Sequence, residues 1–159
     1  MTDSEKLQWL ADRQEIKETI YRYPAGVDTH DWKLFRSIFT DKIDILLSTA
    51  ERAAGRPRQI VSADSFTRSA DRLSAQVFSV TQHFLTIYKI DVRGDDATSL
   101  CYMQARHIPP KDRPTQPLWD VGGYYDFYLR RTAEGWKIWK YTLIVTWETN
   151  RPPDLKMDL

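Results

Sequence analysis

The sequence predicts an α+β fold, with helices concentrated in the first half of the chain and long strands in the second. Apolar residues recur at helical spacing in three segments before residue 76, and four later segments alternate in the manner of strands. Such segregation is typical of α+β proteins rather than of parallel α/β sheets. With 159 residues, we expect one domain over 1–159, with a core at about 5–148 and a tail at 149–159.

The first helix is expected to run from Asp3 to Tyr23, because its apolar side chains recur every three or four residues. Asp3 or Ser4 is able to cap the first free N–H groups of this helix. Pro24 is expected to end the helix, since proline disfavours helical geometry at the residue that precedes it.

Two further helices and a short strand are predicted before the long strands begin. Asp31 is expected to cap a second helix that carries Trp32, Phe35 and Phe39 on one face, and 44–48 resembles a strand. The third helix is expected at 62–75, after a loop with glycine and proline at 55–57, since an apolar stripe runs along it.

The long strands are predicted from residue-by-residue alternation and from turn residues between them. They are expected at 78–92, 97–108, 118–132 and 136–148, with a rigid, proline-rich loop at 109–117. Four antiparallel strands need a covering for one face, and the helices are the elements available for it.

Composition excludes several classes of partner. The 23 Lys and Arg residues nearly balance 22 Asp and Glu residues, so nucleic acid is not an expected partner. Cys101 is the single cysteine, which rules out an intrachain disulfide and favours a reducing compartment. No window contains the roughly 18 apolar residues of a membrane span. We therefore expect a cytoplasmic protein with no membrane partner, and aromatic residues at 13% either fill its core or line a ligand cavity.

Three histidines are the candidates for proton transfer near neutral pH. His30 lies in a polar loop and is expected to face solvent. His83 lies mid-strand, and His107 ends the partner strand. A three-residue turn places His107 directly opposite His83, with both side chains on one face, whereas a two-residue turn places Arg106 there instead.

From the residues alone, two interpretations of Asp28 and of His83 remain open. Asp28 is either a turn aspartate that bonds its own loop or a carboxylate that orients a histidine. His83 is either a core histidine held by one hydrogen bond or a general base. Zinc or iron would require His83, His107 and Asp28 to converge, and no metal is expected.

Two motifs resemble the SnoaL-like, nuclear-transport-factor-2-like superfamily, and most closely its scytalone dehydratases. They are Val-Asp-Thr-His-Asp-Trp at 27–32 and Thr-Gln-His-Phe-Leu at 81–85, followed by Gly-Trp-Lys-Ile-Trp at 135–139. The similarity extends from about residue 5 to 148. It implies a cone-shaped barrel whose strongly curved sheet, mixed or antiparallel, is covered on its concave face by the three helices.

The resemblance also implies site residues. Asp28 and His83 correspond to the Asp-His catalytic pair of the family, and His107 lies near a second pocket histidine. The substrate-binding positions are expected at Val27, Ile45, Cys101, Met103 and Tyr125. Cys101 is alternatively a small buried hydrophobic residue.

The chain departs from the family pattern at several donor positions. Val27 and Ile45 stand where scytalone dehydratases have tyrosines, while Gly123 and Tyr125 replace a serine and an asparagine. Tyr23 stands where dehydrochlorinases have a lysine. The resemblance therefore implies the type of site and leaves the substrate open.

These observations favour a small, cofactorless lyase or isomerase, dehydratase-like, acting on a mainly apolar, aromatic or polyketide-like small molecule. His83 is the expected base, Asp28 its orienting group, and His107 or Tyr125 the hydrogen-bond donor. The alternatives are a noncatalytic ligand-binding or oligomer-forming subunit, and an epoxide hydrolase with Asp126 as a second carboxylate.

Assembly is expected from the aromatic content and from the resemblance. Trp119, Trp139 and Trp147 are many tryptophans for a monomer to bury, and related proteins form dimers or trimers. We therefore expect a homo-oligomer. The tail at 149–159, with two prolines that prevent strand pairing, is expected either to cover the mouth of the barrel or to fray.

Overall fold

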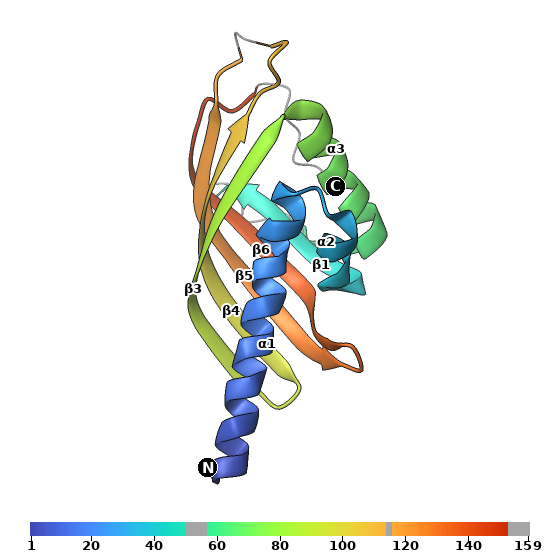
Figure 1. Ribbon diagram of the computed structural model, residues 1–159, viewed down its shortest axis with the longest axis vertical. Coiled ribbons are helices and arrows are strands. Elements are labelled where there is room, and N and C mark those ends of the chain that lie inside the picture. The colour runs from blue at the N-terminus through green and yellow to red at the C-terminus, as the bar shows by residue number, and fades with distance from the viewer. Residues whose placement is uncertain (50–56, 114–115, 153–159) are drawn as a thin grey trace.

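The computed structural model describes residues 1–49, 57–113 and 116–152 and contains, within these ranges, three helices and six strands (Figure 1). In chain order they are α1 (Asp3–Asp28), α2 (Trp32–Ser37), β1 (Phe39–Thr49), β2 (Gln59–Ser62), α3 (Ala63–Val77), β3 (Val80–Arg93), β4 (Asp96–Ile108), β5 (Trp119–Thr132) and β6 (Gly135–Thr149). The four long strands predicted from alternation are confirmed. The predicted loop at 55–57 falls mostly outside the described residues.

The strands form one curved sheet that does not close. Among the described strands the order is β2-β1-β6-β5-β4-β3, so β2 and β3 are the edges. β1 pairs with β6 in parallel, and the other neighbouring pairs are antiparallel, which makes the sheet mixed. Figure 1 shows the helices on the concave side of this sheet. The predicted α+β class and the helical covering of the concave face are confirmed.

The first helix is longer than the sequence predicts. It begins after Thr2, whose hydroxyl accepts a hydrogen bond from the N–H of Glu5 in a capping box, and it continues through Pro24 to Asp28. The predicted end at Pro24 is wrong. Proline removes only one backbone donor, and the turns around it are held by the burial of Tyr23 and Val27 in the core.

Polar contacts fix α1 across the concave face. The Asp12 carboxylate, which is 4% exposed, accepts two hydrogen bonds from the Arg131 guanidinium at 2.7 and 2.8 Å. Further along the helix, Thr19 donates to the carbonyl of Trp136 at 3.2 Å. These contacts fasten α1 to β5 and β6, and they set the position of its C-terminal residue, Asp28, relative to the sheet.

The shorter helices complete the layer. Asp31 caps α2 by accepting a hydrogen bond from the N–H of Leu34 at 2.9 Å, as predicted. Helix α2 ends at Ser37, and Phe39 begins β1 instead of extending the helix. Ser62 caps α3. No helix in the described ranges is long and apolar enough to cross a membrane.

Candidate active site

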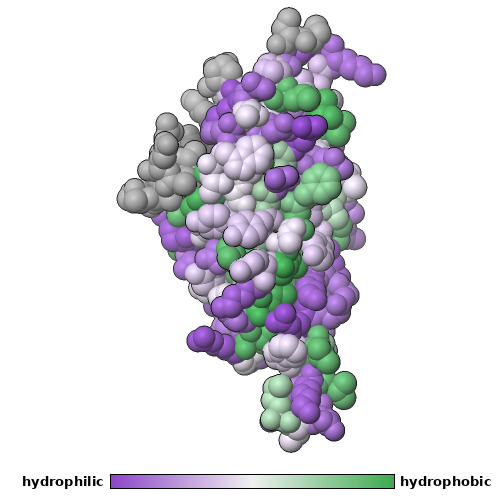
Figure 2. Space-filling view, turned by 90° about the vertical axis from the view of Figure 1, so that its left-hand side faces the viewer, coloured by the Kyte–Doolittle hydropathy of each residue, from purple (hydrophilic) through white to green (hydrophobic). Residues whose placement is uncertain are grey.

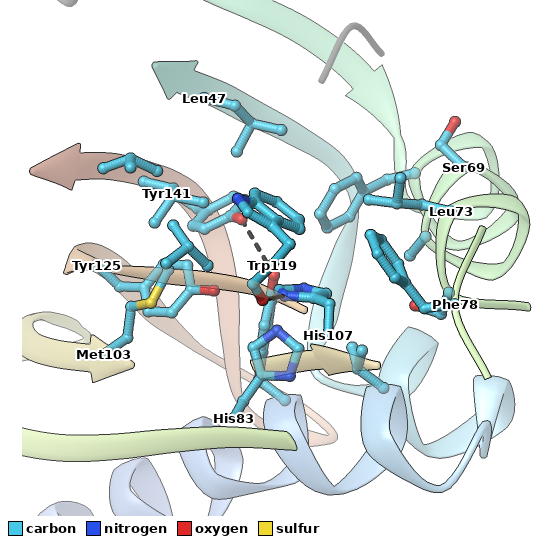
Figure 3. A pocket seen from close by; sticks show the side chains of 18 residues that line it. Leu47, Ser69, Leu73, Phe78, His83, Met103, His107, Trp119, Tyr125 and Tyr141 are labelled. Atoms are coloured by element: carbon cyan, nitrogen blue, oxygen red, sulfur yellow. Dashed lines mark hydrogen bonds between the residues drawn. The ribbon is translucent and has the colours of Figure 1, made fainter. Parts of the chain in front are cut away.

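A cavity of about 130 Å³ lies on the concave side of the sheet (Figure 3). The end of α1, one face of α3 and the inner side chains of β1, β4, β5 and β6 enclose it, together with one residue of β3. Its walls are mainly apolar and aromatic. Among its lining residues, the histidine, tyrosine and serine side chains are Tyr23, Ser69, Ser74, His83, His107, Tyr125 and Tyr141.

Asp28, the last residue of α1, contacts the beginning of β3. Its Oδ1 lies 2.6 Å from His83 Nδ1, and its Oδ2 accepts a hydrogen bond from the backbone N–H of His83 at 2.7 Å. The hydroxyl of Thr81 donates to Oδ1 at 2.9 Å. The structure therefore brings Asp28 and His83 together, and the carboxylate bonds a strand rather than its own loop.

The charge state of Asp28 follows from these contacts. Burial raises the pKa of the Asp28 carboxyl, but the hydrogen bonds and positive charge of His83, with the hydrogen bond from Thr81, hold the pKa below its ordinary value of 3.8. At neutral pH Asp28 is a carboxylate with no proton to donate. The proton between the two side chains is therefore on His83 Nδ1, and whenever the ring carries this one proton its Nε2 is an acceptor at the cavity.

His107 also lines the cavity, but the predicted registers are wrong. Neither His107 nor Arg106 lies directly opposite His83, because that partner is Ala105. A two-residue turn joins β3 to β4, and a bulge at Tyr88 shifts the pairing by one further residue. His83 and His107 are consequently diagonal neighbours on one face, with ring centroids 5.6 Å apart.

His107 is a neutral side chain among aromatic rings. Its ring stacks on Trp119 with centroids 4.1 Å apart and lies 4.9 Å from Phe78. Burial, and next the charge of His83, lower the pKa of His107 to about 4. Its Nδ1 lies 3.3 Å from the Trp119 carbonyl oxygen, which accepts and cannot donate. Nδ1 therefore carries the proton of the neutral ring, and Nε2 is an acceptor.

Three tyrosines from three elements meet at the cavity. Tyr23 from α1 lies between Tyr125 of β5 and Tyr141 of β6, with ring centroids 5.3 and 6.0 Å away. The hydroxyls of Tyr23 and Tyr141 form a hydrogen bond of 3.1 Å. Burial raises the pKa of Tyr125 and Tyr141 well above the ordinary value. All three phenols therefore stay protonated at neutral pH and act as hydrogen-bond donors.

Three of the five predicted substrate-binding residues line the cavity, namely Val27, Met103 and Tyr125. Ile45 and Cys101 do not, which corrects their assignment. Both are fully buried in the core, and in each case the paired residue on the neighbouring strand is a tyrosine that lines the cavity instead. Burial raises the pKa of the Cys101 thiol to about 11, so Cys101 is an unreactive core residue.

Several lining residues were not predicted as site residues. Phe66, Leu73 and Ser74 come from α3, whose apolar stripe is visible in the sequence, although no local pattern reveals what the stripe covers. Trp119, counted in the sequence among the tryptophans that are many for a monomer to bury, is 3% exposed and lines the cavity. The signal for Trp119 was its shared alternation with Tyr125 along one strand.

Other candidate residues lie outside the cavity. His30 is exposed, as predicted, and stacks on Trp32. Asp126 follows the inward-facing Tyr125, so it points to the opposite face of β5, and there it accepts a hydrogen bond from Tyr128. Within the ranges that the structure describes, no three His, Cys, Asp or Glu side chains are placed to hold a metal ion.

Comparison with known proteins agrees with this architecture. Residues 8–142 match the model of the SnoaL-like domain. A protein of Kribbella flavida with a solved structure is 30% identical, with 88% of this chain and 94% of that chain covered and a TM-score of 0.77. No curated protein matched the chain.

More distant solved structures share the fold. A candidate scytalone dehydratase of Novosphingobium aromaticivorans is 20% identical, with coverage of 96% of this chain and 93% of that chain and a TM-score of 0.75. A type 2 hexachlorocyclohexane dehydrochlorinase is 17% identical, with coverage of 94% and 99% and a TM-score of 0.74. The matched domain covers most of the chain, and the chain therefore belongs to the SnoaL-like family, with the nuclear-transport-factor-2-like fold.

Proposed function

We propose that this protein is a small, cofactorless lyase or isomerase, dehydratase-like, that removes a proton next to a carbonyl group in a mainly apolar small molecule. The observation that carries the proposal is the contact between Asp28 and His83 at an apolar cavity. Two solved relatives are named as a dehydratase and a dehydrochlorinase, and both names describe eliminations. Their names agree with the proposed class of reaction.

His83 is the base in this proposal, and Asp28 is its orienting group. The Asp28 carboxylate holds the proton on Nδ1, so the lone pair of Nε2 is available to a C–H bond in the cavity. As the ring takes up the proton, the adjacent carboxylate stabilises the imidazolium that forms. The low pKa of Asp28 keeps the carboxylate charged throughout this step.

Tyr125 is the better donor to the developing enolate oxygen. His107 is neutral at pH 7 and its only N–H points at the Trp119 carbonyl, so its Nε2 accepts and does not donate. Tyr125 lines the cavity with a protonated hydroxyl. A hydrogen bond from a preorganised phenol stabilises negative charge where it forms. We assign to His107 the acceptance of a hydrogen bond from a substrate hydroxyl.

Two alternatives make different predictions. A noncatalytic binding subunit has no use for an ordered carboxylate and histidine pair, although the apolar cavity by itself suits such a role. An epoxide hydrolase needs a second carboxylate near Asp28, and Asp126 points away from the cavity.

We propose the cytoplasm as the compartment of this protein, because its single cysteine favours a reducing environment.

The test uses acetophenone, whose methyl protons lie next to a carbonyl and whose one ring suits the cavity. The protein in D2O is expected to exchange these protons for deuterium, followed by NMR. His83→Ala and Asp28→Asn should each slow the catalysed exchange about a hundredfold or more. The double variant should be little worse than the poorer single one, because the two side chains act as a unit.

The matched control is His30→Ala, which removes an exposed histidine distant from the cavity and should leave exchange unchanged. Circular dichroism of each variant checks that the fold is retained. Exchange that persists at the wild-type rate in folded His83→Ala contradicts a catalytic role and favours the binding subunit. The same conclusion follows if the wild-type protein exchanges the protons no faster than a variant in which His30 and His83 are both replaced by alanine.

A further inference from the structure

Ser74 differs from every other buried polar residue in the described part of the chain. These residues are Asp12, Thr19, Ser74, Thr81, Ser99 and His107. Each of the others has a polar partner through its side chain: Arg131, the Trp136 carbonyl, Asp28, the Lys89 carbonyl and the Trp119 carbonyl, respectively. The hydroxyl of Ser74, a residue only 6% exposed, makes no hydrogen bond with any described residue.

Ser74 faces the cavity of the candidate active site. It lies on α3 and lines the cavity together with its neighbour Leu73. Figure 3 shows Ser69 and Leu73 on α3, across the cavity from Tyr125 and Met103. Ser69 lines the same wall, but its hydroxyl already accepts a hydrogen bond from Arg72 at 3.1 Å. Ser74 is therefore the serine of the α3 wall whose hydroxyl makes no hydrogen bond with any described residue.

The Ser74 hydroxyl is open to the cavity in the free protein. Among the described residues, Gln116 Nε2 is the fully buried side-chain nitrogen or oxygen without a partner, and the Ser74 oxygen is not in that state. A ligand that fills the cavity buries this hydroxyl, and leaving it without a partner then costs about 1–3 kcal/mol. An oxygen or a nitrogen of the ligand at this point avoids that cost. A ligand without a polar atom there leaves the group unpaired, and the site discriminates against that ligand.

The size of the cavity limits what the ligand is. Its volume of about 130 Å³ is similar to the roughly 150 Å³ of a cavity that accommodates one benzene molecule. A single six-membered ring with short substituents fills this space, whereas a fused bicyclic ring system exceeds it.

We propose that Ser74 is a specificity-determining residue, and that the substrate is a monocyclic carbonyl compound with a second polar oxygen on the side of the ring remote from the carbonyl. This inference rests on the proposed function, because it assumes that the carbonyl group of the ligand lies beside Tyr125. The ring lies against the apolar walls between the two polar ends, and the remote oxygen bonds the Ser74 hydroxyl.

Binding measurements test the proposal without any turnover. Isothermal titration calorimetry compares acetophenone with para-hydroxyacetophenone, which adds one hydroxyl opposite the carbonyl. The wild-type protein is expected to bind the hydroxylated ketone about tenfold more tightly, as one well-formed hydrogen bond gives. In Ser74→Ala this ratio should fall to about twofold or less, while Ser69→Ala, which alters the same wall, should keep it.

Two further readouts separate a ligand-binding role from a structural one. The Tm of Ser74→Ala should stay close to that of the wild type, because the hydroxyl has no hydrogen bond to a described residue that the variant could lose. Acetylnaphthalene should bind more weakly than acetophenone, although it carries more apolar surface. An unchanged ratio in Ser74→Ala, a lost ratio in Ser69→Ala, tighter binding of acetylnaphthalene, or no binding of either ketone at millimolar concentration would each overturn the proposal.

Failure here is distinguishable from failure of the proposed function. Loss of methyl-proton exchange in His83→Ala with an unchanged affinity ratio in Ser74→Ala retains the lyase or isomerase and removes the specificity assignment. The opposite pattern retains a selective binding site and removes the catalytic role.

Discussion

His107 connects the chemistry of the cavity to the stability of the fold. Its pKa lies at about 4 instead of 6.5 because burial disfavours the charged ring. The unfolded chain takes up a proton as the pH falls through about 6.5, while the folded protein does not until about 4. Over this interval the unfolded state binds more protons, and acidification therefore favours unfolding.

We expect the free energy of unfolding to fall by about 3 kcal/mol between pH 7 and pH 4, at about 1.4 kcal/mol for each pH unit of the pKa difference. Urea denaturation at several pH values measures it. His107→Phe keeps an aromatic ring between Trp119 and Phe78 but removes the titration, so its stability should change much less over the same interval. Equal pH dependence in the two proteins would contradict the burial of a neutral His107.

Asp28 contributes in a different pH window. Its pKa is held below 3.8, so the stability that its hydrogen bonds give is present above that value and is lost as the pH falls through the lower, folded pKa. The two contributions are separable, because the loss from His107 is complete near pH 4, where the loss from Asp28 only begins.

The candidate site residues were partly readable from the sequence. Asp28, His83 and His107 carry their own signals, since few residue types move protons near neutral pH. Ser74 and the α3 wall carry none, because a serine on an amphipathic helix is ordinary and its lack of a partner exists only after packing. Ile45 and Cys101 were misplaced for a related reason. Alternation shows on which face of a strand a side chain lies, but it does not show whether a larger side chain on the neighbouring strand lines the cavity in its place.

At the scale of elements, the close crossing of α1 and α2 places the catalytic candidate Asp28. Gly26 is buried in the last turn of α1, and a Cβ added there would lie 2.8 Å from the backbone nitrogen and the Cβ of Phe35. These atoms belong to the short helix α2 and are not the end of a flexible side chain. The helices approach this closely because residue 26 has no side chain.

Gly26→Ala is expected to destabilise the fold by about 1–3 kcal/mol through overpacking, even though alanine is the better helix former. The change should also displace Asp28, two residues later, and slow the exchange of acetophenone methyl protons. Ala25→Ser alters an exposed position in the same turn and should stay within about 0.5 kcal/mol of the wild type. Chemical denaturation of both variants provides the comparison, and a stabilised Gly26→Ala would show that the two helices can separate freely.

The same scale explains which elements the sequence predicted. Long strands with strict alternation were found nearly to the residue, because the period of a half-buried strand is local. The continuation of α1 through Pro24 depends on tertiary burial, which propensity does not contain. The parallel pairing of β1 with β6 and the bulge at Tyr88 are likewise contacts between distant segments.

For the whole molecule, the convex face of the sheet is the main unexplained surface (Figure 2). Aromatic residues on it remain open to solvent, with Phe84 63%, Tyr88 70%, Tyr102 54% and Trp147 46% exposed. The Trp147 indole covers Gly122 so closely that an added Cβ would lie 2.2 Å from it. Scattered aromatic residues are common on surfaces, but a group on one face is typical of a binding surface.

The terminal segments bear on assembly as well. Figure 1 shows the first turns of α1 projecting beyond the sheet, and Leu7 and Leu10 there are 68% and 55% exposed. The predicted closure of the cavity by the tail at 149–159 falls mostly outside the described residues, which end at Pro152. It stays a prediction.

We expect a second copy of the chain to cover the convex face, forming the homo-oligomer predicted from the tryptophan content. The reasoning changes in one respect, because Trp119 lines the cavity and only Trp139 and Trp147 belong to this face. Sedimentation of the wild-type protein at micromolar concentration should show a species heavier than 18.7 kDa.

A stable interface buries about 800 Å² on each partner, an area large enough to include Phe84 and Tyr102 together. Phe84→Glu combined with Tyr102→Glu introduces charges that such an interface cannot bury unpaired, so this variant should sediment as the single chain while remaining folded. Tyr21→Glu, which places the same charge on an exposed position of α1, should sediment as the wild type does. A wild-type protein that remains a single chain, or an assembly that persists in the double variant, would exclude the convex face as the interface.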